Sequence, residues 1–312
     1  MRVLLTGGGG VGSLALYNQW FCIEPRHEVH LCDSNATARP CWVAREHWHE
    51  APPALVNGLT NPEYIAAMKA LAWRMDLVIP GIDEELRPLA ARMPEKLLLP
   101  DFDTVATHLD KLASMRFLKT HGIDVPATAR LRPRLDDRSA YWPPFPCVVK
   151  PREGRGSRHV AIVGSESEGL AHVTLSREPA GDFITQEVLV GREYTVGVLA
   201  DKQKQLKAVI PVRVDQKRGI TTRAQVDDDP AVHALGEQIH AAAPFAGYIN
   251  VQCIKEADGR VRPFEINPRI STTTCLAVAA GLDLIGGYLG GEALPHGLKP
   301  LTLRRSYQTE FL

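Results

Sequence analysis

The chain has 312 residues, with 36 Lys and Arg against 36 Asp and Glu, so its formal net charge at pH 7 is +0. This balance excludes a typical nucleic-acid-binding protein, which needs a basic excess to neutralise phosphates. The length favours two or three lobes. The 6 cysteines form no Cys-x-x-Cys pair, which favours reduced thiols and a cytoplasmic location. The apolar run 275–291 contains glycines and Asp283, which favours a buried helix over a membrane span.

The N-terminal segment predicts a strand, a glycine-rich turn and a helix. Arg2–Leu5 is a short apolar run, Gly7–Gly12 is the turn, and a helical pattern follows over 14–21. The next strand, Glu28–Cys32, ends at Asp33. An acid at this distance from a glycine loop is typical of the ribose-holding position of a dinucleotide fold. The alternative is that the glycines only allow close packing, so a nicotinamide-dependent oxidoreductase stays open.

Acidic residues follow the third predicted strand. Asp76–Pro80 is that strand, and its carboxyl end leads through Gly81 into Asp83 and Glu84. Ligands gather at the carboxyl ends of parallel strands, so these acids could face a substrate amine. The alternative, favoured slightly for Glu85, is that acids suit the first turn of a helix. A fourth strand is expected at Lys96–Leu99.

Two lysines and a basic loop come next in the chain. A helix over 103–121 carries Lys111, and the apolar strand Cys147–Val149 ends at Lys150. The segment Arg152–Arg158 contains two glycines and three arginines between strands. Such a loop can cover phosphates with backbone amides and guanidinium groups. It is not a Walker loop, which opens a helix; a polar hairpin tip is the alternative.

Further along, a strand over 183–190 is expected to end in a bend at 191–193. Arg213 and Arg218 flank a segment, 215–223, which we expect to be flexible and able to carry charge to a phosphate.

A hairpin near the C-terminus carries the strongest pattern. The segments 248–254 and 261–269 read as strands, and Asp258-Gly259 is typical of a two-residue turn. Counting back from that turn predicts two facing pairs: Gln252 opposite Glu265, and Asn250 opposite Asn267. Cross-strand neighbours lie about 5 Å apart, so these oxygens can share a hard cation such as magnesium. A longer loop would shift this register, and a solvated edge strand is the alternative.

The order of these features resembles the ATP-grasp ligases, in the branch of carbamoyl-phosphate synthetase modules and amino-acid ligases. The resemblance covers almost the entire chain. It rests on these motifs: Asp110-Lys111, Val148–Pro151 with Gly154–Ser157, Gln186-Glu187 with Gly191–Tyr194, Asn250–Gln252, and Phe264–Arg269. The chain holds one module and no visible glutaminase partner region, which puts the making of carbamoyl phosphate in doubt.

The resemblance implies an α/β and α+β fold, with a Rossmann-like parallel-sheet domain followed by a two-lobed ATP-grasp fold. The implied domains are 1–103, a small lobe with its connecting helix over 104–189, and a large lobe over 190–312 with the metal and catalytic site. It also implies an ATP-dependent ligase that forms an amide or peptide bond through an acyl phosphate.

The resemblance further implies the residues of the site. ATP would contact Lys111, Lys150, Gly154, Gly156, Ser157, Gln186, Glu187, Val188, Leu189 and Glu193. Magnesium or manganese would bind Gln252, Glu265 and Asn267, and the catalytic arginines would be Arg269 and Arg213. The substrate pocket would include Asp83, Glu84, Arg218, Ser271 and Thr272.

The expected partners are a small-molecule carboxylate and an amine, with no nucleic acid and no membrane, in a homodimer. Two other functions remain as alternatives: an NAD(P)-dependent oxidoreductase that uses the glycine loop, and a nucleotide-binding protein without catalytic activity.

Overall fold

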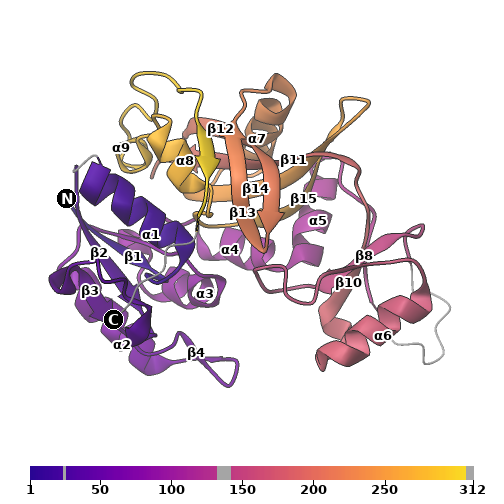
Figure 1. Ribbon diagram of the computed structural model, residues 1–312, viewed down its shortest axis with the longest axis horizontal. Coiled ribbons are helices and arrows are strands. Elements are labelled where there is room, and N and C mark those ends of the chain that lie inside the picture. The colour runs from indigo at the N-terminus through magenta and orange to yellow at the C-terminus, as the bar shows by residue number, and fades with distance from the viewer. Residues whose placement is uncertain (24–25, 132–141, 307–312) are drawn as a thin grey trace.

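The computed structural model describes residues 1–23, 26–131 and 142–306, organised around three main sheets. Figure 1 shows the N-terminal sheet and the small lobe with α6 at opposite sides, with the six-stranded sheet between and above them. A short separate hairpin joins β4 (Leu55–Val56) to β5 (Leu59–Thr60).

The N-terminal sheet is parallel throughout, with the strand order β3-β2-β1-β6. Its strands are β1 (Arg2–Thr6), β2 (Glu28–Asp33), β3 (Trp48–Glu50) and β6 (Leu77–Ile79). Its helices are α1 (Val11–Tyr17), α2 (Pro62–Trp73) and α3 (Asp83–Arg92), and a π-helical turn over 18–23 follows α1. The predicted strand Lys96–Leu99 was wrong, because only a single bridge joins Val78 to Leu97 and β3 supplies the fourth strand.

The small lobe is an antiparallel sheet in the order β7-β10-β8-β9, with α6 (Glu166–Ser176) beside it. The strands are β7 (Thr128–Arg130), β8 (Cys147–Pro151), β9 (Ala161–Val163) and β10 (Phe183–Glu187). Its hydrophobic cluster is small and separate: Leu131, Cys147, Val149, Val163, Val173 and Phe183.

The large sheet is antiparallel, in the order β15-β14-β11-β12-β13-β16. The strands are β11 (Gly191–Ala200), β12 (Leu206–Arg218), β13 (Ile220–Val226), β14 (Gly247–Glu256), β15 (Val261–Asn267) and β16 (Thr302–Arg304). The predicted bend at 191–193 is the start of β11. The expected flexible segment 215–223 is instead a hairpin that turns at Gly219, whose φ is 71°.

Two long helices predicted from the sequence are each broken. The expected helix 103–121 is α4 (Phe102–Leu109) and α5 (Lys111–Thr120), because Asp110 leaves the helix and caps α5 through the amides of Leu112 and Ala113. The last helix is α8 (Thr274–Ala279) and α9 (Leu284–Tyr288), separated at Gly281, whose φ is 125°. The remaining long helix is α7 (Pro230–Ala242). No helix among the described residues combines the length and apolar character that crossing a membrane requires.

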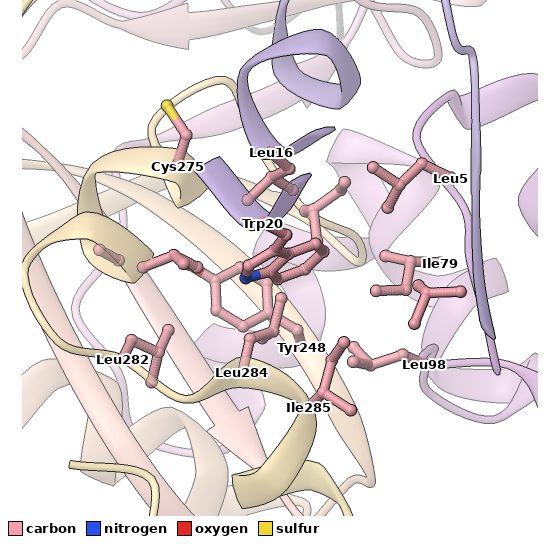
Figure 2. Close-up of a cluster of buried hydrophobic side chains, with 14 of the residues drawn as sticks. Leu5, Leu16, Trp20, Ile79, Leu98, Tyr248, Cys275, Leu282, Leu284 and Ile285 are labelled. Carbon is pink, nitrogen blue, oxygen red and sulfur yellow. The ribbon is translucent and has the colours of Figure 1, made fainter. Parts of the chain in front are cut away.

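The N-terminal sheet and the six-stranded sheet share one hydrophobic core. Figure 2 shows Trp20, from the turn after α1, among Leu5 of β1, Tyr248 of β14, and Leu284 and Ile285 of α9. Burial of these side chains excludes water from both sheets at once. The N-terminal sheet is therefore held firmly against the sheet that carries the β14–β15 hairpin.

Candidate active site

The β14–β15 hairpin has the predicted pairs, although its turn differs from the prediction. Asn250 lies opposite Asn267, and Gln252 opposite Glu265. The loop is one residue longer than expected, since Glu256 pairs with Arg260 and Gly259 donates to the Glu256 carbonyl (3.0 Å). A β-bulge opposite Gln252 and Cys253 shifts the register back by one residue. The two departures cancel, so the four side chains face one another in the predicted pairs.

A cleft of about 380 Å³ lies between the small-lobe sheet and this hairpin. We call it the nucleotide cleft. Every residue predicted to contact ATP lines it, together with Gln252 and Glu265: Lys111, Lys150, Gly154, Gly156, Ser157, Gln186, Glu187, Val188, Leu189 and Glu193. The fold brings these residues together from β8, β10, β11, β14, β15, the start of α5 and the loops that follow β8 and β10.

Two buried lysines give the nucleotide cleft its positive charge. Lys111 donates to the Gly154 carbonyl (2.9 Å), and Lys150 donates to the Phe264 carbonyl (3.2 Å). Burial lowers the pKa of Lys150 from 10.5 to about 8, with Glu265 opposing that shift and Lys111 adding to it. Among the described residues neither lysine forms an ion pair. Buried cations that lack a carboxylate partner suit a bound anion.

The side chain of Glu187 is engaged by the protein. Both nitrogens at the end of Arg262 bind its carboxylate, at 2.8 and 2.7 Å, and the Ala127 amide donates to it at 3.0 Å. The Arg262 guanidinium holds the pKa of Glu187 below its usual value. The contribution of Glu187 to the cleft is therefore its backbone, with that of Val188 and Leu189, which suits pairing with a flat base.

Lys217 is a site residue that the sequence prediction missed. Its ammonium group bridges Glu193 (2.8 Å) and Gln252 (3.1 Å), and it lines the nucleotide cleft. Lys217 lies opposite Thr221 across the turn at Gly219. Recognising Arg218-Gly219 as a hairpin turn would have placed Lys217 on a strand facing the site.

The predicted metal ligands fit a magnesium ion that arrives with a nucleotide. Asn250 lies opposite one of these ligands, Asn267. It is 3% exposed, and its buried Oδ1 has no hydrogen-bond partner among the described residues. An unsatisfied buried oxygen is costly, so it favours a cation or its water there. No group of three His, Cys, Asp or Glu residues suited to a metal occurs in the described part of the chain. Glu265 is the one carboxylate of the predicted set, and magnesium commonly takes one carboxylate plus substrate phosphates.

A second cleft of about 240 Å³ adjoins the first and shares Gln252 and Glu265 with it. The N-terminal glycine loop forms one side. On the other side lie four of the predicted site residues: Asn267, Arg269, Ser271 and Thr272.

Four of the predicted catalytic and substrate-binding residues do not line this second cleft. Arg213 lines neither cleft and pairs with Asp215 (2.9 Å) and Asp227 (3.4 Å), and its predicted catalytic role stays a prediction. Arg218 is exposed at the end of β12 and lines neither cleft. The carboxylates of Asp83 and Glu84 bind arginines, and their predicted contact with a substrate amine stays a prediction.

The amides of the glycine loop are used inside the N-terminal sheet. Gly8 donates to the Cys32 carbonyl, Gly10 to the Gly7 carbonyl and Gly9 to Asp33 Oδ2, each at 2.8 Å. A Cβ on Gly9 would lie 2.4 Å from that of Ala38. The middle of the loop serves close packing, and both carboxylate oxygens of Asp33 already accept hydrogen bonds, from Gly9 and Asn35, so the oxidoreductase alternative is not favoured.

The combination of buried lysines, a glycine-containing loop, an amide-carboxylate hairpin and a following arginine is typical of the nucleotide-binding site of ATP-grasp proteins. Residues 180–294 match the family model described as ATP-grasp in the biosynthetic pathway with Ter operon. Together with the fold, this match supports placing the chain beside the ATP-grasp proteins that it resembles.

Similar proteins of known sequence agree with this placement. The carbamoyl phosphate synthase large chain of Vibrio cholerae is 29% identical over 151 residues, which cover 44% of this chain and 14% of that protein. The D-alanine–D-alanine ligase of Syntrophotalea carbinolica is 30% identical over 103 residues, 33% of each chain. The chain thus matches well under half the length of either relative.

Among solved structures, the fold is similar to that of N5-carboxyaminoimidazole synthetase from Staphylococcus aureus complexed with ADP. The TM-score is 0.72 at 15% identity, over 96% of this chain and 81% of that one. The similarity therefore extends across the N-terminal sheet and both lobes of the cleft.

Proposed function

We propose that the protein is an ATP-dependent carboxylate–amine ligase. It forms an amide or peptide bond through an acyl phosphate and releases ADP and phosphate. The observation that carries this proposal is the β14–β15 hairpin, whose Gln252–Glu265 pair lines the same cleft as Lys111 and Lys150. The ATP-dependent relatives support it, and the domain boundaries at 103 and 189 are part of the same proposal.

In this proposal the nucleotide cleft binds ATP. Lys111 and Lys150 neutralise phosphates, the loop Gly154–Ser157 covers them, and Glu193 holds the ribose. Gln252, Glu265 and Asn267 hold magnesium or manganese. The bound cation offsets phosphate charge during transfer of the phosphoryl group. Positioning and electrostatics dominate such chemistry, so the site needs no nucleophilic side chain of its own.

The second cleft binds the substrates. Three cationic side chains line it: Arg155, Lys217 and Arg269. Each is paired with an acid, and the terminal nitrogens of both guanidinium groups still offer donors. Such donors suit a carboxylate that attacks the terminal phosphorus of ATP, and the volume of the cleft suits a molecule of amino-acid size. Arg269 steadies the phosphoryl group, and Ser271 and Thr272 shape the pocket for the amine that follows.

We also propose that the protein is a homodimer and that it is located in the cytoplasm. The buried thiols of Cys32, Cys147, Cys253 and Cys275, which form no disulfide, support a reducing compartment. The net charge of +0 supports small molecules rather than nucleic acids as partners.

A phosphate-release screen tests the activity. Mg·ATP is offered with each member of a panel of carboxylates, with and without each of a panel of amines, and EDTA serves as the control. We expect release that needs the metal and a carboxylate, with an amide product when the amine is present. Tight NADH binding without Mg·ATP binding would contradict the ligase. Mg·ATP binding without turnover across the panel would favour a non-catalytic nucleotide-binding protein.

A further inference from the structure

Two arginines that line the second cleft come from different parts of the chain. Arg155 lies in the loop between β8 and β9, and Arg269 follows β15. Arg155 also lines the nucleotide cleft and the cavity of about 200 Å³ above the N-terminal sheet. It therefore lies where the nucleotide, the second cleft and the N-terminal sheet meet.

Consecutive acids at the start of α3 bind these two arginines. Both carboxylate oxygens of Glu84 accept from Arg155 Nε, at 3.1 and 3.0 Å. Asp83 Oδ1 accepts from Arg269 Nε. The second pair is nearly buried, with side-chain exposures of 13% for Arg269 and 11% for Asp83.

These contacts differ from two other ion pairs of the structure. Arg87 binds Glu153, and Arg262 binds Glu187, each through both terminal nitrogens of the guanidinium. Asp83 and Glu84 instead bind the inner nitrogen, Nε. The terminal nitrogens of Arg155 make no hydrogen bond among the described residues, and Arg269 uses only Nη1, on the Ile270 carbonyl (2.9 Å). Terminal donors therefore remain for an anion in the cleft.

The helix that carries the acids is firmly anchored. Glu85 is 1% exposed and binds Thr6, Tyr64 and the amides of Gly81 and Ile82. Burial raises the pKa of Glu85. One turn later, Arg87 binds Glu153 of the same loop that carries Arg155. The start of α3 is thus a rigid support for both arginines.

We propose that Asp83 and Glu84, at the start of α3, are positioning residues. They orient Arg269 and Arg155 toward the terminal phosphate of the bound nucleotide. This inference rests on the proposed ATP binding. The inference predicts the direction in which phosphate affinity changes when the acid is removed. An acid beside an anion site weakens anion binding by its charge alone, so removing it should strengthen binding unless orientation of the arginine matters more.

The test compares two nucleotides, so that the terminal phosphate is isolated from the rest. Dissociation constants for Mg·AMP-PNP and Mg·ADP are measured by calorimetry on the wild type, Asp83→Asn and Glu84→Gln. Glu63→Gln is the matched control, because Glu63 is an exposed acid in the first turn of α2 with no arginine partner among the described residues. Thermal unfolding checks that each variant folds.

We expect the wild type to prefer Mg·AMP-PNP, and each α3 variant to reduce that preference roughly tenfold, the effect of one charge-assisted hydrogen bond. Glu63→Gln should leave the preference unchanged. In an Arg269→Lys background, Asp83→Asn should add less than about a twofold change, because both act through one group.

Three results would overturn the inference. One is an unchanged or stronger preference in both α3 variants, which would mean that the acids only repel phosphate or sequester the arginines. Another is an equal loss of affinity for both nucleotides, which would indicate a structural role. Failure of the wild type to bind either nucleotide would contradict the proposed function as well, and so is distinguishable from the first two.

Discussion

The two walls of the nucleotide cleft are built in different ways. The β14–β15 hairpin belongs to a sheet whose buried core, around Trp20 and Tyr248, is shared with the N-terminal sheet. The opposite wall is the loop between β8 and β9, which leaves a small lobe with its own minor core. Positive φ angles occur along this loop, at Gly154 (120°), Gly156 (69°) and Ser157 (56°).

The loop is held by polar contacts instead of packing. Lys111 binds the Gly154 carbonyl, Arg152 pairs with Asp110, and Arg87 pairs with Glu153. The Arg87–Glu153 pair is exposed, and exposed ion pairs contribute little stability, so the part of this wall that it holds can open locally while the packed wall stays in place. The comparison shows a division between the two walls. Residues that need a fixed geometry, such as Glu265, lie on the packed wall. The residues proposed to cover the phosphates lie on the loop.

Removing the carboxylate of the packed wall should have the largest effect. Glu265→Gln is expected to reduce ATP turnover at least about a thousandfold, since charge offset by a metal is worth several kcal/mol in the transition state. Phosphate release is measured against magnesium concentration. Asp258→Asn, in the exposed turn of the same hairpin, is the control and should keep its activity. Full activity in Glu265→Gln would mean that the metal ligands are assigned wrongly.

Replacing a large buried side chain in each core by alanine should test the difference between the two walls. Trp20→Ala should cost about 3–5 kcal/mol of unfolding free energy, and Phe183→Ala a similar amount within the small lobe. Hydrogen exchange then separates them. Trp20→Ala should speed exchange in both the N-terminal sheet and the six-stranded sheet, and Phe183→Ala mainly in β7 to β10. Equal exchange everywhere in both variants would mean that one cooperative core joins the walls.

The pH dependence of nucleotide affinity tests Lys150, which lies between the walls. Its pKa is lowered from 10.5 to about 8 by burial. Below that pH the side chain is charged and binds phosphate, and above it the charge is lost. Affinity for Mg·AMP-PNP should therefore fall above pH 8, by up to about tenfold per unit. Lys150→Arg keeps its charge and should flatten the profile; the same decline in that variant would exclude Lys150 as its cause.

The smallest effect is expected at the hairpin turn. Gly259 has a φ of 89° and open space around it. Gly259→Ala should cost about 1 kcal/mol of stability, through backbone strain alone. Urea unfolding measures that loss, and Mg·AMP-PNP affinity should not change, because the bulge near Gln252 sets the register at the site. A loss of affinity would show that the turn, and not the bulge, controls the pairing.

Local patterns in the sequence determined several strands of this protein and the pairing of side chains at the site. Alternation and turn residues predicted β14, β15 and the pairs Gln252–Glu265 and Asn250–Asn267, because side-chain direction in a strand follows from sequence position alone. Through the family resemblance, the motif order predicted many of the residues that line the nucleotide cleft, although it missed Lys217. Yet the predicted register was correct only because a longer loop and a bulge offset each other.

Tertiary structure decided what depends on contacts between distant segments. Arg269 and Asp83 are 186 positions apart, and the sequence shows only an acid at a helix start and an arginine after a strand. Likewise, only the folded chain shows that Lys217 donates to Glu193 and Gln252. It also shows that Arg213 forms ion pairs with Asp215 and Asp227. Ion pairs have no sequence period, so their partners are selected by the packing of whole sheets and helices.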